Sequence, residues 1–294
     1  MDEKNLQTDL FEEHRGHLRA VAYRMLGSVS EADDAVQEAW LRLDRADTAD
    51  VVNMGGWLTT VVARVCLNML RSRETRREES LENRLPDPIV SGVDGVDPEH
   101  EALLADSVGL ALLVVLETLE PAERMAFVLH DMFAVPFDEI APIVGRTSAA
   151  TRQLASRARR RVKGAATAPD PDLSRQREVV DAFLAASRDG DFDALVAVLD
   201  PDVMLRADSG TVARGGWLEL RGALSVAKQA LRFQRLAMAS RPVLVNGTAG
   251  ILTAVNGEVI GVMAFTIAAG KVVTIEIFAD RDRLRDLGVS PVDA

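Results

Sequence analysis

Residues 137–163 read FDEIAPIVGRTSAATRQLASRARRRVK, and this stretch decides how the middle of the chain folds. Its apolar residues recur at helical spacing before and after Gly145-Arg146-Thr147. Two helices joined by a turn of about three residues that contains glycine form a helix-turn-helix. The sequence therefore predicts helices over 137–144 and 148–163, with Thr147 or Ser148 as the N-cap of the second helix.

The second of these helices is basic, although the chain as a whole carries a formal net charge of −11. From Arg146 to Lys163 there are seven Lys or Arg residues and no acid, whereas 78–106 holds nine acids and one basic residue. Exposed charges more than about 10 Å apart are screened at 0.1 M salt. The stripe formed by these seven basic residues, and not the net charge of the chain, therefore decides whether phosphate binds. The stripe predicts contact with DNA, and a solvated basic helix is the alternative.

Further helices are predicted on the N-terminal side of this motif. Apolar periodicity places them at 9–26, 31–43, 57–73, 108–119 and 121–132. Gly27 ends the first of them, and Ser30 with Asp33 is typical of a capping box at the start of the second. Gly55-Gly56 is expected to break the chain before the third.

Two segments have the composition of linkers. Residues 78–107 combine acidic residues with prolines and glycines, and 165–174 contains Pro169 and Pro171. Beyond the second linker, helical segments are followed by strand-like ones, at 203–207, 242–245, 250–255, 259–267 and 272–278. Asn-Gly pairs at 246–247 and 256–257 are strong hairpin signals. The chain from 175 to 294 is therefore predicted to be an α+β domain with an antiparallel sheet.

Composition narrows the class of protein. No apolar run reaches the roughly 18 residues that a membrane span needs, and the N-terminus lacks the pattern of a secretory leader. Cys66 is the one cysteine, so an internal disulfide framework is excluded. His14 and His17 lack a third ligand, which is poor support for a metal site. We therefore expect a cytoplasmic protein with no membrane segment, metal or cofactor.

Two separate motifs in the first 163 residues resemble one family. The sequence EADDAVQEAWLRL at 31–43 closely resembles region 2 of the extracytoplasmic-function group of sigma-70 factors. The stretch 56–73 looks like the promoter-melting part of the same region, and 119–162 resembles region 4. The resemblance implies two all-α domains, region 2 at 1–77 and a region 4 helix-turn-helix at 108–164, joined by the acidic linker at 78–107.

The C-terminal part, 175–294, is similar to SnoaL-like domains of the NTF2-like cone fold. RLPDP at 84–88 resembles the linker motif Trp-Leu-Pro-Glu-Pro, and DRDRL at 280–284 resembles Asn-Pro-Asp-Lys-Leu. A third motif, Asp-Gly-Gly-Gly-Lys, is only faintly present at 208–210. The resemblance implies that these motifs act in regulation between the domains, through Leu85, Pro86, Asp87, Pro88, Asp208, Asp282, Arg283 and Leu284.

The resemblance also implies which residues act on the promoter. In region 4, the −35 element would be read by Thr151, Arg152, Gln153, Ser156 and Arg157. In region 2, the −10 element would be bound and melted by Asn53, Trp57, Asn68, Arg71 and Arg73, although Trp57 is more typical of a core residue. Core RNA polymerase would be contacted by Asp33, Asp34, Gln37 and Glu38, for which a solvated acidic face is the alternative.

The sequence thus favours a sigma factor that directs core RNA polymerase to promoter DNA and is modulated by its own cone domain. The rival is a stand-alone helix-turn-helix regulator with a ligand-sensing or enzymatic cone. No histidine follows His130, so the usual general base is missing. Asp208, Glu258 and Glu276 remain as acids without an assignable pair, and we expect no catalysis. An anti-sigma protein and a small molecule in the cone stay open as further partners.

Overall fold

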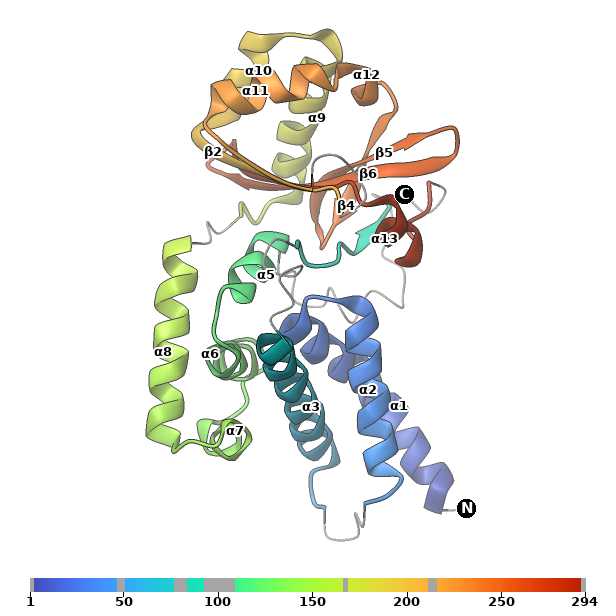
Figure 1. Ribbon diagram of the computed structural model, residues 1–294, viewed down its shortest axis with the longest axis vertical. Coiled ribbons are helices and arrows are strands. Elements are labelled where there is room, and N and C mark those ends of the chain that lie inside the picture. The colour runs from blue at the N-terminus through green and yellow to red at the C-terminus, as the bar shows by residue number, and fades with distance from the viewer. Residues whose placement is uncertain are drawn as a thin grey trace. The chain divides into compact units, whose positions relative to one another are not determined.

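The fold was analysed in a computed structural model that describes residues 3–46, 51–76, 84–92, 109–165, 169–210 and 216–291. Contacts divide the chain into two compact units, with the boundary inside α5 (Leu110–Glu117). The helical unit holds the described residues of the first 76 and of 113–165 (Figure 1). The cone domain holds the described residues 84–92, 109–112 and 169–291.

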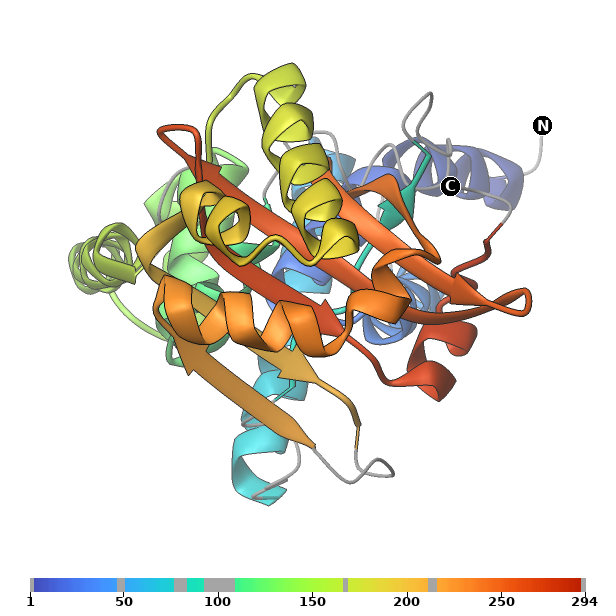
Figure 2. The same cartoon turned by 90° about the horizontal axis from the view of Figure 1, so that it is seen from above.

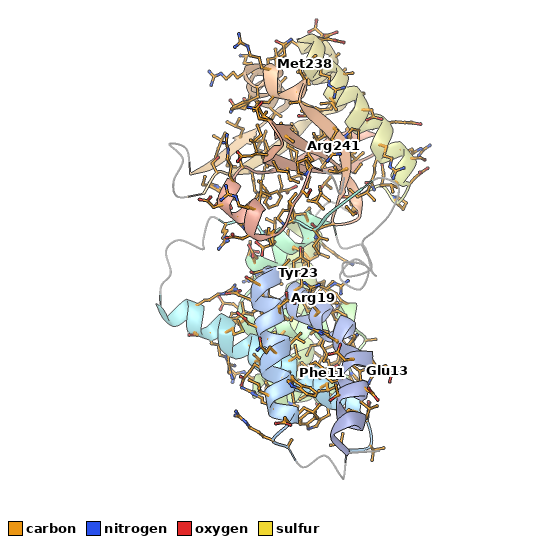
Figure 3. All side chains as sticks on the ribbon, turned by 90° about the vertical axis from the view of Figure 1, so that its right-hand side faces the viewer. Phe11, Glu13, Arg19, Tyr23, Met238 and Arg241 are labelled. Carbon is orange, nitrogen blue, oxygen red and sulfur yellow. The ribbon has the colours of Figure 1, made fainter. Side chains whose placement is uncertain are left out.

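Three helices form the first part of the helical unit: α1 (Glu3–Leu26), α2 (Val29–Leu43) and α3 (Met54–Arg76). All three pack against one another, and Leu18, Leu43 and Leu58 are fully buried among them. Arg19 and Tyr23 lie one turn apart on α1 (Figure 3). Tyr23 is in the core, whereas the Arg19 Nε donates to the Asp33 Oδ1 of α2 at 2.6 Å.

The structure corrects two expectations about how α2 and α3 begin. The capping box of Ser30 and Asp33 is wrong, because α2 begins at Val29 and the Asp33 carboxylate is bound by Arg19. The break at Gly55-Gly56 is also wrong. The Asn53 Oδ1 accepts a hydrogen bond from the Gly56 N–H at 2.9 Å, so α3 begins at Met54 and runs through both glycines. A Cβ at Gly55 would lie 2.9 Å from the His14 ring of α1, so a larger residue at this position would have to displace that ring.

The rest of the helical unit contains the helix-turn-helix. This part comprises α6 (Pro121–Phe127), α7 (Phe137–Val144) and α8 (Ser148–Ala165), and the helix-turn-helix is formed by α7 and α8. Gly145 ends α7 in the left-handed conformation, with φ 68° and ψ 42°, and the Thr147 Oγ1 accepts a hydrogen bond from the Ala150 N–H at 3.2 Å. The predicted turn and the Thr147 cap are therefore confirmed. The helix expected over 121–132 changes at Val128 into a π-helical turn, η1 (Val128–Met132).

The cone domain is built on one mixed sheet. Its strands are β1 (Val90–Ser91), β2 (Leu199–Asp208), β3 (Trp217–Arg221), β4 (Ser240–Val245), β5 (Thr248–Val255), β6 (Glu258–Ala268) and β7 (Lys271–Phe278), in the order β1-β4-β5-β6-β7-β2-β3. The helices are α9 (Leu173–Asp189), α10 (Phe192–Val198), α11 (Ala223–Arg232), α12 (Gln234–Ala237) and α13 (Arg281–Asp286). Seen from above, α9 to α12 lie across one face of this sheet (Figure 2).

The predicted α+β class and both Asn-Gly turns are confirmed. Asn246 and Asn256 have φ values of 50° and 54°, and the glycine after each is also left-handed, as a type I′ turn requires. An entirely antiparallel sheet is wrong, because β2 pairs with β7 in parallel. Parallel pairing needs a long crossover, and here the whole of β3 to β6 lies between the two partners. Neither β3 nor the short β1 was expected.

The two faces of the sheet differ in character because side chains alternate along a strand. Leu205, Phe265 and Ile275 belong to the apolar core under the helices. Arg206 and Glu276 are paired residues on neighbouring strands, one position along from Leu205 and Ile275, so they face the opposite side. The helix-covered interior is therefore apolar, and the buried carboxyl of Glu276 lies outside it.

Candidate nucleic-acid interface and linker clasp

The exposed face of α8 carries most of the residues expected to read DNA. Arg152, Gln153, Ser156 and Arg157 are all exposed, and Leu154, Ala155 and Ala158 between and beyond them are buried against the rest of the unit. Arg160 and Arg161 continue the same face one turn later. A helix that turns one basic face outward and one apolar face inward suits insertion into the major groove of DNA.

Thr151 differs from the expectation made for it. Its side chain is 0% exposed, and its Oγ1 donates to the Thr147 carbonyl oxygen at 3.0 Å. The hydroxyl therefore stabilises the first turn of α8 and lies on the packing side of the helix. Helical spacing places Thr151 at the border between the exposed basic face and the buried apolar face of α8. Because α8 packs against α6 and α7, Thr151 belongs to the buried face.

The arginines of α8 are held by neighbouring side chains. Glu123 of α6 pairs with both Arg157 Nε, at 3.1 Å, and Arg161 Nη1, at 3.0 Å. The π-helical turn brings Asp131 to Arg159, where the Nε–Oδ1 distance is 2.5 Å. These partners restrict the guanidinium groups while leaving other nitrogens of each group able to donate.

A second surface lies on α2, where Asp34 and Gln37 are exposed. Asp33 and Glu38 are each bound within the unit, Asp33 by Arg19 and Glu38 by Arg42 at 2.9 Å. Leu41, which was not among the predicted residues, is 41% exposed on the same face. Its signal was a leucine seven residues after Asp34, at the spacing of two helical turns. The face combines acidic, amide and apolar groups, a composition suited to a protein partner.

The residues expected to melt DNA divide into two groups. Asn68 and Arg71 are exposed on α3, and Arg64, which sequence analysis missed, extends their stripe by one turn. Arg73 instead donates to the Leu26 carbonyl oxygen at 3.2 Å and pairs with Glu31, so it holds the unit together.

The other two residues of that set lie near the start of α3. Asn53 is exposed and caps the helix, and Trp57 is half-buried. The exposed amide and guanidinium groups on α3 form a track that can bind single-stranded phosphates.

In the cone domain, four residues form a buried cluster that we call the linker clasp: Leu85, Asp87, Asp208 and Arg283. The Arg283 Nε donates to the Asp87 Oδ1 at 2.7 Å, and its Nη1 donates to the Asp208 Oδ2 at 3.0 Å. Its Nη2 donates to the Leu85 carbonyl oxygen, while the Leu85 N–H donates to the Asp208 Oδ2 at 3.3 Å. Arg283 is 9% exposed, Asp87 3% and Asp208 7%, so the charges are almost fully desolvated.

The clasp fixes one end of a longer docked segment. Pro86 and Pro88 are buried, and the Ile89 N–H donates to the Asn246 Oδ1 at 3.1 Å. Val90 and Ser91 then pair with the edge of β4 as β1. Short peptides that add a strand to a sheet edge are bound in this way.

The α13 motif contributes unequally to the clasp. Leu284 is buried with Arg283, whereas Asp282 is exposed and pairs with Arg285 at 3.1 Å. Of the expected regulatory set, hydrogen bonds therefore join the four residues of the clasp, whereas Pro86, Pro88 and Leu284 are buried and Asp282 is exposed.

The three acids considered for catalysis lie in three different environments. Asp208 is part of the clasp, and Glu258 is exposed at the start of β6. Burial raises the pKa of Glu276 to about 7, and the Arg206 guanidinium at 3.6 Å opposes that increase.

Within the described part of the chain, His, Cys, Asp and Glu side chains form no group of three suited to a metal ion. No helix among the described residues is long and apolar enough to cross a membrane.

Comparison with known proteins supports the assignment of both helical regions. The family model of sigma-70 region 2 matches residues 10–76, and that of sigma-70 region 4 matches 109–162. The ECF RNA polymerase sigma factor SigJ of Mycobacterium tuberculosis is 42% identical over 292 residues, covering 95% of this chain and 93% of SigJ. The probable ECF sigma factor SigI of the same species is 38% identical over 277 residues.

A solved structure agrees with these relatives. The crystal structure of M. tuberculosis SigJ covers 97% of this chain and 99% of its own, with a TM-score of 0.78 and 38% identity. The exposed arginine helix and the two matched regions define a promoter-recognition subunit of RNA polymerase. The chain belongs to the extracytoplasmic-function (ECF) family of sigma factors. The interpretation as a sigma factor is thereby confirmed over that of a stand-alone regulator.

Proposed function

We propose that this sigma factor reads the −35 element with Arg152, Gln153, Ser156 and Arg157 of α8. Arginine can donate two hydrogen bonds to guanine O6 and N7, and neighbouring basic residues fix the register through phosphates. The observation that supports this proposal most strongly is the exposed basic face of α8, on which all four side chains lie. Thr151 is left out of the set because its side chain is buried.

For region 2, we propose two separate contacts. Asp34, Gln37 and Leu41 of α2 bind core RNA polymerase, since these three side chains are exposed on one helix face. The stripe of Arg64, Asn68 and Arg71 on α3 follows the single strand of the melted −10 element.

We further propose that the cone domain acts through the linker clasp. The clasp binds residues that lie in the chain between region 2 and region 4, so the cone controls the linker that joins them. Eight residues lie between Arg76, at the end of α3, and Leu85, and the nine Cα–Cα steps that join these two residues span about 30 Å at most. Opening the clasp releases Leu85 from the cone domain, so the segment after α3 is no longer fixed at that end. Control through the clasp does not require catalysis, and the apolar interior of the cone supports a non-catalytic role. The anti-sigma protein and the small-molecule ligand stay predictions.

The direct test is run-off transcription with core RNA polymerase on a promoter library. The double variant R152A/R157A should lose the −35-dependent transcripts. R235A is the matched control, because Arg235 is exposed on α12 of the cone and makes no ion pair among the described residues. Equal transcription by the double variant and the control would overturn the assignment of α8.

A further inference from the structure

The helix that precedes the helix-turn-helix supplies one carboxylate to the DNA-facing helix. α6 and α8 lie side by side in the helical unit (Figure 1). The Glu123 side chain is only 6% exposed, yet its two oxygens reach two arginines one turn apart, Arg157 and Arg161. Both arginine side chains remain about half exposed, at 54% and 52%. A buried carboxylate thus pairs with two arginines whose side chains remain half exposed.

The atoms that Glu123 uses decide what is left for DNA. Glu123 Oε1 lies 3.1 Å from Arg157 Nε, so the two terminal nitrogens of Arg157 keep their outward fork. Glu123 Oε2 lies 3.0 Å from Arg161 Nη1, which leaves the other nitrogens of Arg161 able to donate. An arginine fork is the group that binds phosphate or guanine in a bidentate manner. The pairing therefore restricts both guanidinium groups and leaves each one a pair of donors. On Arg157 this pair is Nη1 and Nη2, and on Arg161, whose Nη1 makes an ion pair without a hydrogen bond, it is Nε and Nη2.

Two costs of DNA binding are lowered by this arrangement. Arginine loses considerable rotamer freedom when it is fixed in an interface, and a side chain already held loses less. Arg157 and Arg161 also carry like charges at i and i+4, which repel each other on a helix. A carboxylate between them offsets that repulsion.

We infer that Glu123 is a positioning residue for promoter recognition, which presets Arg157 and Arg161 for contact with the −35 DNA. This inference rests on the proposed function of α8. Positioning by Glu123 and a general electrostatic effect of its charge predict different results for DNA binding. Removing the negative charge of Glu123 should strengthen attraction to any DNA, whereas loss of orientation should weaken discrimination between sequences.

The experiment compares full-length E123Q with wild type, each assembled with core RNA polymerase. The probe is a duplex library randomised at the −35 element, with a scrambled duplex as the non-specific reference. E123Q should lower the ratio of specific to non-specific binding about tenfold while non-specific binding stays equal or rises. E120Q is the matched control, since Glu120 is three residues earlier, exposed and without an ion pair among the described residues. It removes the same charge and should leave the ratio unchanged.

A second measurement separates positioning from folding. In the R157A/R161A background, E123Q should have no further effect on the ratio, because the groups that Glu123 orients are gone. An unchanged ratio for E123Q in the wild-type background would overturn the inference. An equal loss in both backgrounds, together with a lower melting temperature, would also overturn it and assign Glu123 a structural role. Absence of any −35 discrimination by the wild-type holoenzyme would instead refute the proposed function of α8.

Discussion

Removing the Asp87 carboxylate should release the linker segment from the cone domain. Asp87 belongs to the segment, and its partner Arg283 belongs to α13. The variant D87A deletes the contacts from Arg283 Nε and Nη2 but leaves Arg283 paired with Asp208 at 3.0 Å. The cone itself therefore keeps its own ion pair, and the loss falls mainly on the docking of residues 84–92.

The size of the effect follows from burial. Breaking a buried ion pair by removing one partner costs about 3–5 kcal/mol when the remaining charge is left alone. Here Arg283 keeps Asp208 and the Leu85 carbonyl, so the lower end, about 3 kcal/mol, is expected. Since 1.4 kcal/mol is a factor of ten, local opening of the segment should become about 100-fold more frequent.

Hydrogen exchange measured by mass spectrometry on peptides that span 84–92 reports this opening. The N–H groups of Leu85 and Ile89 donate to Asp208 and Asn246, so both should exchange faster in D87A. D282A is the control, because Asp282 is exposed and pairs only with its neighbour Arg285 in the described structure. Exchange that is unchanged in D87A, or equally raised in D282A, would refute the clasp as the element that holds the linker.

Three further predictions concern single groups. Because burial raises the pKa of Glu276 from 4.5 to about 7, the folded state binds a proton that the unfolded state has lost, and stability should fall as pH rises from 4.5 to 7. At about 1.36 kcal/mol per pH unit, the free energy of unfolding should fall by about 3 kcal/mol over this range. Urea unfolding of E276Q at each pH should not show this fall. A wild-type plot of unfolding free energy against pH that is parallel to the E276Q plot would contradict the assignment. Burial, with His14 and Arg24 nearby, lowers the pKa of His17 below 6.5, so stability should fall as pH drops below 6.5, and H17Q should flatten that side of the curve. T151V should cost about 1 kcal/mol through the lost hydrogen bond to the Thr147 carbonyl but leave −35 discrimination intact; altered discrimination at wild-type stability would show that Thr151 contacts DNA.

Local features of the fold were predictable from the sequence because their causes are local. Gly145 permits the left-handed end of α7, and Thr147 caps α8, so the turn of the helix-turn-helix follows from adjacent residues. The same holds for the hairpins at Asn246-Gly247 and Asn256-Gly257, whose backbone conformations these residue types favour. The exposed face of α8 also follows from helical spacing, apart from Thr151 at its border.

Features that depend on distant residues were not predictable by such reasoning. Arg283 and Asp87 are 196 positions apart; the family resemblance placed both in one regulatory set, but their pairing was not predicted. Gly55 lies against His14 of α1, a contact between two helices that the sequence near Gly55 does not indicate. The parallel pairing of β2 with β7 depends on the path of four intervening strands. The Glu123 pairings join two helices and leave no trace in the spacing of either one.

The most direct test of the account is run-off transcription with core RNA polymerase by wild type, D87A and D286A. Asp286 is exposed on α13 and makes no ion pair among the described residues, so D286A controls for the loss of one carboxylate. We expect transcripts that require core polymerase, a yield from D87A that differs from wild type at least threefold in either direction, and a D286A yield equal to wild type. Equal yields from D87A and wild type, with the linker segment released in D87A by hydrogen exchange, would contradict control through the linker clasp.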